Sequence, residues 1–136
     1  MHTIWIIDDS LVVRKIVEFS LGRLGYQVRS FVDGVEALRA LTALHQNPFL
    51  SLPEVIILDI SLPRMDGYDV IRAVKARASV AQIPILILSA RDGVMDRLKG
   101  RLVGATGYMV KPFRTQELAT TIANLLPQPS LLPIRH

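Results

Sequence analysis

Residues 56–67 read IILDISLPRMDG, an aliphatic run that meets an aspartate, Asp59, with no polar residue before it. A short aliphatic run bounded by turn residues is typical of a strand buried on both faces of a parallel sheet. Pro63 and Gly67 follow the acid and indicate a loop that leads into a helix. The stretch therefore predicts a buried strand over residues 55–58 that ends in a charged side chain.

The same alternation of an apolar run and a helical pattern occurs along the rest of the chain. Further strands are predicted at residues 4–7 and 85–88, with weaker candidates at 26–31 and 106–110. Ser10 can cap the first helix, which Gly25 is expected to end, and Asp33 precedes the second. The positions predicted to share a helix face are Val13, Ile16, Val17, Ser20, Leu21 and Leu24; Ala37, Leu38, Leu41 and Leu44; Val70, Ile71, Val74 and Ala78; and Leu118, Ile122, Leu125 and Leu126.

This order of elements predicts the fold class. Strands that alternate with helices form a parallel sheet covered on both faces, because right-handed crossovers carry each helix back over the sheet. We therefore predict an α/β fold, a doubly wound five-stranded parallel sheet with five helices, in one domain over residues 1–126. Residues 127–136 contain three prolines and predict a C-terminal tail or the start of a linker.

The composition excludes several classes of function. The chain has no cysteine, which excludes thiol catalysis and cysteine-ligated metals and fits a reducing compartment. No apolar run approaches the roughly 20 residues of a membrane span, and the N-terminus reaches acidic residues too early for a signal peptide. The net charge is +4, but the basic residues are dispersed singly, which argues against direct nucleic-acid binding. We expect a cytoplasmic protein that contacts neither membrane nor nucleic acid.

Polar side chains stand at the carboxyl ends of four predicted strands. Asp8 and Asp9 follow the first strand and Asp59 follows the third. Ser89 ends the fourth strand, and Lys111 follows the fifth. In a parallel α/β sheet the functional loops gather at the carboxyl ends of the strands, so we expect these side chains to lie on one edge of the sheet.

The residue types at this edge indicate phosphoryl chemistry. Three carboxylates in one place repel one another, and a bound cation relieves that repulsion. Oxygen ligands without histidine or cysteine favour a hard cation, with Mg²⁺ ahead of Mn²⁺ or Ca²⁺. A lysine and a hydroxyl beside such a cation can neutralise a phosphoryl group in transfer, and a carboxylate can accept phosphate covalently. Solvated strand ends or helix caps would explain one of these aspartates alone, but not four strand ends together.

The chain resembles the response-regulator receiver domains of two-component signalling. The similarity runs from about Ile4 to Leu126 and rests on IIDDS, DGVEAL, ILDISLPRMDGYDVI, IPILILSA and GATGYMVKPF, in the family's order. It implies the flavodoxin-like strand order 2-1-3-4-5 and a chemotaxis-type single-domain receiver. Such a receiver takes a phosphoryl group from a histidine kinase and then changes its partner-binding surface. It is no enzyme in the usual sense, because it catalyses only its own phosphorylation and dephosphorylation.

The resemblance also implies roles for single residues. Asp59 becomes the phosphoacceptor, with Ser89 and Lys111 contacting phosphoryl oxygens, and Pro112 follows a cis peptide bond. Ser89 and Tyr108 form the switch, in which Tyr108 turns inward when the serine hydroxyl moves toward the phosphate.

The implied metal site uses carboxylates and one backbone oxygen. Asp9 and Asp59 ligate Mg²⁺ (or Mn²⁺) together with the backbone carbonyl of Ser61, and Asp8 contributes through ordered water. Asp8, Asp9, Asp59 and Ser61 are therefore the candidate metal residues.

The implied partners are a histidine kinase or phosphotransfer protein and an output partner that the sequence does not identify, with a homodimer as one option. The switching surface would comprise the fourth helix, the fifth strand and the fifth helix. Basic residues in and beside this region form either a solvated face or a contact for an acidic partner or a second copy: Arg91, Arg97, Lys99, Arg101 and Arg114. Ten residues follow Leu126, too few for a DNA-binding unit, so the chain is either a stand-alone receiver or a piece of a longer protein.

The main alternative function is a constitutive interaction or dimerisation module with a receiver fold that is never phosphorylated. Intact Asp8, Asp9, Asp59, Ser89 and Lys111 argue against it. A flavodoxin-like cofactor protein would need a Ser/Thr/Gly-rich phosphate loop where this chain has DDSLVV. A haloacid-dehalogenase-type phosphatase would need two aspartates separated by one residue, and a nucleotide hydrolase would need a Gly-rich loop.

The fourth predicted helix has weak helical signals. Gly93, Gly100 and Gly104 lie in or beside it, and an interior glycine costs roughly 1 kcal/mol relative to alanine. Its apolar face is thin and consists of Val94, Met95, Leu98 and Leu102. We predict a poorly anchored, mobile helix.

Overall fold

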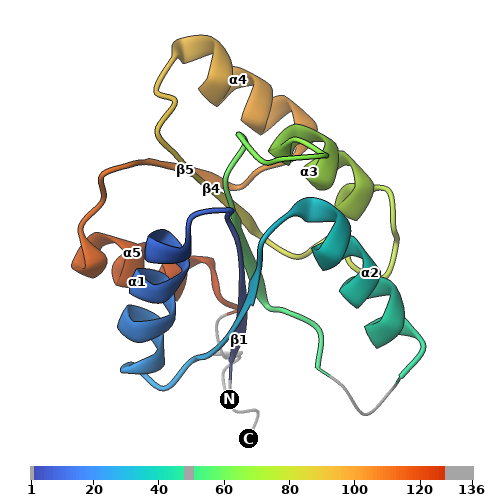
Figure 1. Ribbon diagram of the computed structural model, residues 1–136. Coiled ribbons are helices and arrows are strands. Elements are labelled where there is room, and N and C mark those ends of the chain that lie inside the picture. The colour runs from blue at the N-terminus through green and yellow to red at the C-terminus, as the bar shows by residue number, and fades with distance from the viewer. Residues whose placement is uncertain (1, 48–50, 128–136) are drawn as a thin grey trace, which may run out of the picture.

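The computed structural model describes residues 2–47 and 51–127, which form a five-stranded parallel sheet flanked by helices (Figure 1). The elements are β1 (Thr3–Ile7), α1 (Leu11–Gly22), β2 (Gln27–Phe31), α2 (Gly34–His45), β3 (Val55–Leu58), α3 (Gly67–Lys75), β4 (Ile85–Ser89), α4 (Val94–Val103), β5 (Gly107–Val110) and α5 (Thr115–Leu125). The strand order is β2-β1-β3-β4-β5. This confirms the predicted fold class and strand order. Residues 128–136 of the predicted tail lie outside the described residues.

Both faces of the sheet are buried, which explains why the central strands are aliphatic throughout. One core cluster joins the sheet to α2 and α3, and the other joins it to α1 and α5 (Figure 1). Successive residues of β4 alternate between them: Ile85 and Ile87 belong to the first cluster, Leu86 and Leu88 to the second. A strand between two apolar layers therefore needs apolar residues at every position.

Side-chain caps start three of the helices. Ser10, Asp33 and Asp66 each accept a hydrogen bond from the backbone N–H three residues further on. Gly25 ends α1 as predicted. The last helical residue is Gly22, and Gly25, with a left-handed φ of 91°, closes the helix end: its N–H donates to the Gly22 carbonyl at 3.0 Å, and the Tyr26 N–H donates to the Leu21 carbonyl at 3.2 Å.

The predicted helix faces are partly wrong. In α1, Val17 and Leu21 are buried, but Ile16 is 39% exposed and Leu24 is 57% exposed. A helix that packs on a sheet buries only a narrow stripe, so apolar residues at the border of that stripe remain in solvent. Ala78 also lies outside the predicted face, since α3 ends at Lys75 and Ala78 is exposed.

The orientation of α4 differs from the thin inward face expected from its sequence. Gly100 faces the sheet, where an added Cβ would lie 2.7 Å from Cδ1 of Ile87. Gly93 and Gly104 are the caps of the helix, and Gly104 has a left-handed φ of 115°. The apolar side chains point into solvent, with exposed fractions of 81%, 73%, 45% and 76% for Val94, Met95, Leu98 and Leu102. The mobility of α4 stays a prediction.

The sheet has two functionally different ends. Because the strands are parallel and each helix runs back along them, β1 begins and α5 ends at the amino end of the sheet (Figure 1). The loops that enter α1, α3 and α4 lie at the opposite, carboxyl end. Within residues 2–47 and 51–127, no helix combines the length and apolarity needed to cross a bilayer.

Candidate functional site

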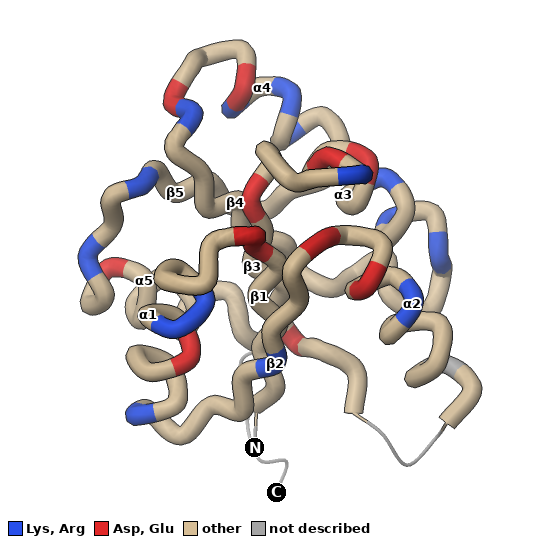
Figure 2. Tube along the Cα trace, viewed as in Figure 1, with Lys and Arg blue, Asp and Glu red and all other residues tan. Residues whose placement is uncertain are grey.

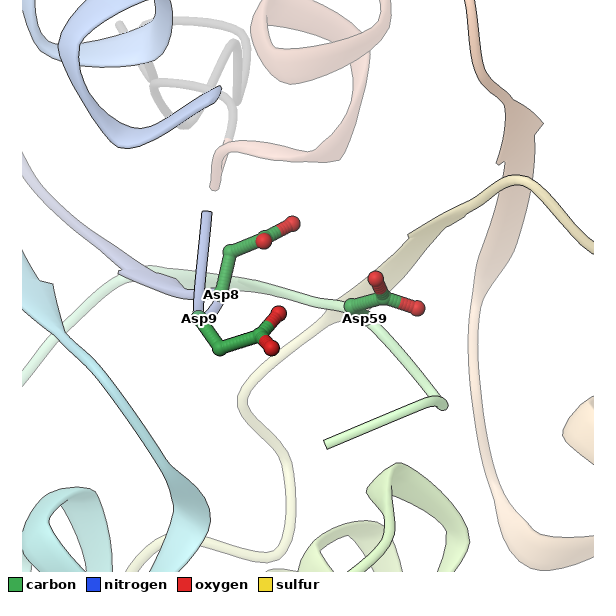
Figure 3. Close-up of side chains that lie close together, drawn as sticks. All are labelled: Asp8, Asp9 and Asp59. Atoms are coloured by element: carbon green, nitrogen blue, oxygen red, sulfur yellow. The ribbon is translucent and has the colours of Figure 1, made fainter. Parts of the chain in front are cut away.

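Three carboxylates meet at the carboxyl end of the sheet, as Figure 3 shows for Asp8, Asp9 and Asp59. Strands β1 and β3 are neighbours, with Ile7 level with Leu58, so the residues that follow them emerge side by side. One carboxylate oxygen from each aspartate lies within 4.8 Å of the others. The structure thus brings together the three acids that the sequence places after two separate strands, β1 and β3.

The three aspartates differ in burial. Asp8 is fully buried and Asp59 is 7% exposed, whereas Asp9 faces solvent. One oxygen of each buried carboxylate accepts a hydrogen bond from a backbone N–H. The Ser10 N–H donates to Oδ1 of Asp8 at 2.9 Å, and the Ser61 N–H donates to Oδ1 of Asp59 at 3.0 Å. In the described part of the chain, Asp9 has neither a hydrogen bond nor an ion pair, which leaves its oxygens available to a ligand.

Lys111 joins the two buried carboxylates. Its Nζ lies 2.7 Å from Oδ2 of Asp8 and 3.0 Å from Oδ2 of Asp59. Burial lowers the pKa of Lys111, but the hydrogen bonds and the attraction to both carboxylates outweigh it and hold the pKa above its ordinary value. The side chain is therefore a fixed cation inside the site. The peptide bond from Lys111 to Pro112 is cis, which confirms that prediction.

The charge balance of the site fits a divalent cation. Three carboxylates and one ammonium leave two negative charges. The available ligands are oxygens only, which suits a hard ion such as Mg²⁺. Asp8, Asp9 and Asp59 each offer one oxygen to such an ion. The two negative charges that Lys111 leaves uncompensated match the charge of one divalent cation.

The two predicted switch residues are hydrogen-bonded to the same loop. Ser89 is 1% exposed at the end of β4, and its Oγ accepts the N–H of Arg91 at 3.2 Å. The Tyr108 hydroxyl donates to the Arg91 carbonyl at 2.6 Å. Burial raises the pKa of Tyr108 and Asp96 adds to the rise, while Arg91, Arg97 and a hydrogen bond with Ser89 oppose it. Ser89 and Tyr108 therefore both bond to the Arg91 backbone, at the start of the segment that leads into α4.

Three further contacts near the site escaped the sequence analysis. Arg14, one turn into α1, donates from a guanidinium nitrogen to the Asp8 carbonyl at 2.7 Å. On the other side, the hydroxyl of buried Tyr68 donates to Oδ1 of Asp96 at 3.1 Å, and Arg91 pairs with the same oxygen at 2.6 Å. Burial, followed by the hydrogen bond to Asp96, raises the pKa of Tyr68 to about 12. No sequence pattern pairs these residues, because the contacts join different elements.

Acidic residues occur both at the site and on the outer helices. Figure 2 shows red segments at the ends of the central strands, and red and blue segments interspersed along the surrounding helices. In the described part of the chain, basic residues therefore alternate with acidic ones instead of occupying one segment.

Comparison with known proteins agrees with this geometry. The sequence model of the response regulator receiver domain family matches residues 4–123 of this chain. Protein PilG of Pseudomonas aeruginosa is 35% identical over 124 residues, which cover 91% of this chain and 87% of PilG. The probable transcriptional regulator ycf27 of Guillardia theta is 40% identical over 89% of this chain, but the chain spans only 44% of that protein. The structure of the Vibrio cholerae chemotaxis protein CheY4 superimposes with a TM-score of 0.83 at 32% identity, covering 93% of this chain and 99% of CheY4.

Proposed function

Because the chain belongs to the response regulator receiver domain family, we propose that it is a phosphoacceptor that takes a phosphoryl group onto Asp59 from a histidine kinase or phosphotransfer protein. One observation carries the proposal. Lys111 contacts both Asp8 and Asp59 inside a cluster of three carboxylates, so a fixed cation stands beside the reactive carboxylate. This arrangement suits the charge that a phosphoryl group carries during transfer.

The transfer is a displacement at phosphorus. A carboxylate oxygen of Asp59 attacks the phosphorus of a phosphohistidine, the new O–P bond forms, and the P–N bond breaks. The imidazole leaves with the electron pair and is neutralised by a proton from solvent. Lys111 pairs with one phosphoryl oxygen, and the Ser89 hydroxyl donates to another. Asp9, Asp59 and the Ser61 carbonyl would hold Mg²⁺ (or Mn²⁺), with Asp8 contributing through water, and the bound cation would supply positive charge against the remaining phosphoryl oxygens.

Hydrolysis of the acyl phosphate restores the carboxylate. Water attacks the phosphorus, the bond to the Asp59 oxygen breaks, and inorganic phosphate leaves. The protein therefore acts on itself alone, and we do not class it as an enzyme with an external substrate. We expect both steps to take place in the cytoplasm.

Phosphorylation would act on the output surface through Ser89. A phosphate adds roughly 1.5 to 2 negative charges and three acceptor oxygens, so it draws the Ser89 hydroxyl toward it. Ser89 already accepts the Arg91 N–H, and Tyr108 donates to the Arg91 carbonyl. The displacement of Ser89 therefore changes the packing of Tyr108 and the segment that enters α4.

The output surface comprises α4, β5 and α5. The exposed apolar side chains of α4 support this assignment, since a helix that leaves them in solvent has room for a partner. Arg97 and Arg101 border them on the side of β5. The output partner is a protein with a complementary surface or a second copy of this chain, and we propose no direct contact with nucleic acid.

The phosphoryl donor would approach beside α1. A shallow, almost wholly apolar hollow lies along that helix, adjacent to Asp9 in the chain, and is lined by Leu11, Val12, Lys15, Ile16, Phe19, Ser20 and Thr115. Phe19 is 68% exposed there. A helical kinase or phosphotransfer domain could cover this hollow while its phosphohistidine reaches Asp59.

Labelling with acetyl phosphate and Mg²⁺ tests the phosphoacceptor. The unaltered protein should gain one phosphoryl group by mass spectrometry, and Asp59→Asn should gain none while remaining folded. Asp66→Asn, which changes a nearby capping aspartate, is the matched control and should label normally. Labelling of Asp59→Asn at the level of the unaltered protein would refute the assignment.

The constitutive interaction module is tested separately. Beryllofluoride with Mg²⁺ imitates the acyl phosphate, and it should shift the amide resonances of Ser89 and Tyr108. An unchanged spectrum there would favour the constitutive module. That alternative is not favoured by the intact site, in which Asp8, Asp59 and Lys111 contact one another.

A further inference from the structure

The loop between β3 and α3 contains one strained residue, five positions after Asp59. Arg64 has a φ of 65° and is the sole non-glycine residue with positive φ in the described ranges. The Met65 N–H donates to the Pro63 carbonyl at 2.7 Å, which closes a γ-turn around Arg64. A γ-turn with positive φ is the rarer and more strained form, and glycine would adopt it more readily. Arginine at this position therefore indicates a role for its side chain.

The Arg64 side chain reaches the loop between β2 and α2. Its Nε donates to Oδ2 of Asp33 at 2.9 Å, and a terminal guanidinium nitrogen contacts the same oxygen. Asp33 is 5% exposed, and its other oxygen caps α2 by accepting the Glu36 N–H at 2.9 Å. The hydrogen bond from the Glu36 N–H lowers the pKa of Asp33, and burial raises it. Arg64 lowers it further, so the pKa of Asp33 lies below its ordinary value. The pair thus consists of a permanent cation and a carboxylate that is ionised at neutral pH.

The other end of this loop is fixed by close backbone packing. The Gly67 N–H donates to the Ile60 carbonyl at 2.9 Å, and a Cβ on Gly67 would lie 2.5 Å from the carbonyl oxygen of Asp59. The Asp59 carboxylate accepts the N–H of Ser61 at the start of the loop. Both ends are therefore tied to the end of β3, and the Arg64 contact holds the exposed middle.

We propose that the Arg64–Asp33 pair is a positioning clamp that fixes the β3–α3 loop and so sets the affinity of the acidic site for Mg²⁺. The Ser61 carbonyl, which we propose as a ligand, lies in the segment that the clamp holds. Without the pair, the strained turn at Arg64 relaxes and the loop loses its fixed position. The inference rests on the proposed function for the identity of the cation, but not on phosphorylation of Asp59.

Electrostatics alone makes the opposite prediction. Arg64 is a positive charge near the acidic site, so neutralising it should strengthen the binding of a cation if charge were its only effect. Positioning predicts weaker binding from the same substitution. The direction of the change therefore separates the two effects.

The experiment is a titration of metal-free protein with MgCl₂, followed by the amide resonances of Asp9 and Ser61, without any phosphoryl donor. Arg64→Gln removes the charge and keeps a side chain of similar length. It should raise the Kd for Mg²⁺ by about 10-fold, as the loss of an outer partner of a metal ligand does. Asp33→Asn should raise the Kd for Mg²⁺ by a similar factor. The double variant should also raise it by no more than about 10-fold, because both substitutions break the same contact.

Two variants control for charge and for the turn. Arg72→Gln removes the same charge from an exposed pair with Asp69 on α3 and should leave the Kd unchanged. Arg64→Gly relieves the strained turn and should be folded, yet it should show the same loss of affinity as Arg64→Gln. Wild-type affinity in Arg64→Gly would mean that the strain matters and the pair does not.

An unchanged or lower Kd for Arg64→Gln would overturn the clamp. The absence of Mg²⁺-dependent shifts in the unaltered protein would remove the cation site and the clamp with it. Failure of acetyl phosphate to label the protein would instead count against the proposed function alone, because the titration contains no phosphoryl donor.

Discussion

The cation-free site should be electrostatically unfavourable, so that replacing Asp59 by asparagine stabilises the fold. Carboxylates within 4.8 Å of each other repel by about 3.5 kcal/mol or more at an effective dielectric constant near 20. Asp59 experiences this repulsion from buried Asp8 and a weaker, solvent-screened repulsion from Asp9. On the same scale its attraction to Lys111, at 3.0 Å, is about 5.5 kcal/mol. An asparagine carbonyl keeps accepting from Lys111, so part of that attraction survives. We expect a net stabilisation of about 1 kcal/mol.

Urea unfolding with the fluorescence of Trp5 measures this difference. Trp5 is the single tryptophan and is 1% exposed, so it reports the loss of the core. In EDTA, Asp59→Asn should unfold at a urea concentration higher by roughly 0.5 M. At Mg²⁺ near ten times its Kd the unaltered protein should gain about 1.4 kcal/mol, and the variant should gain less. The stability difference should therefore close or reverse when Mg²⁺ is added.

Asp69→Asn is the matched control. It makes the same charge change in an exposed pair with Arg72, and it should alter stability by less than about 0.5 kcal/mol in either buffer. Lower stability of Asp59→Asn in EDTA would refute the reasoning, because Asp59 would then be a net stabilising charge. An equal gain from Mg²⁺ in both proteins would show that Asp59 does not contact the ion.

Three further outcomes are expected from other parts of the structure. Gly67→Ala should lose roughly 2 to 3 kcal/mol in thermal unfolding, because the new Cβ meets backbone atoms at 2.5 Å, whereas Gly22→Ala, with nothing within 4 Å, should be no less stable. Tyr68→Phe removes the hydroxyl that holds Asp96 and should cost about 1 kcal/mol and speed amide exchange in α4 but not in α1; unchanged exchange in α4 would count against this anchor. The pKa of Asp33 is below its ordinary value of 3.8, so its ionised form stabilises the fold at higher pH and this contribution is lost as the pH falls through the folded-state pKa. The stability difference between the unaltered protein and Asp33→Asn, measured by urea unfolding at a series of pH values, should thus be constant near neutrality and shrink below pH 3.8; a constant difference down to acid unfolding would contradict this.

The sheet could be predicted from sequence because its central strands are buried on both faces. The predicted strand at 55–58 coincides with β3, and the other four differ from the observed strands by one residue at an end. Polar residues at strand ends were equally informative, since the ends of parallel strands must share one edge. The topology alone then brought Asp8, Asp9 and Asp59 together.

The direction in which a helix faces could not be predicted in the same way. Periodicity identifies an apolar stripe, but not whether the stripe contacts the sheet or solvent. In α4 the stripe points outward, and the inward side is formed by Gly100, whose missing side chain permits close approach to Ile87, and by Val103, which packs against the core. One glycine and one valine do not form a pattern that indicates which side of the helix faces the sheet.

Contacts between separate loops were also beyond the sequence. Arg64 and Asp33 are 31 residues apart, and Tyr68 and Asp96 are 28 apart. Arg64 and Asp33 lie in strand-to-helix connections, and Tyr68 and Asp96 lie in the first turns of α3 and α4. Each pair forms because the fold brings these helix starts to the same end of the sheet. A single sequence has no periodic pattern that relates one loop to another.

The start of β1 and the end of α5 lie at the opposite end of the sheet from the acidic site, and this has a practical consequence. The chain enters β1 and leaves α5 at the amino end of the sheet, one full strand length away from Asp59 (Figure 1). A fluorescent protein, an affinity tag or a surface tether attached at either end would leave the acidic site open to a phosphoryl donor. A module held at the amino end of the sheet would be out of contact with the phosphate, and it would respond to phosphorylation only through a change in the outer helices.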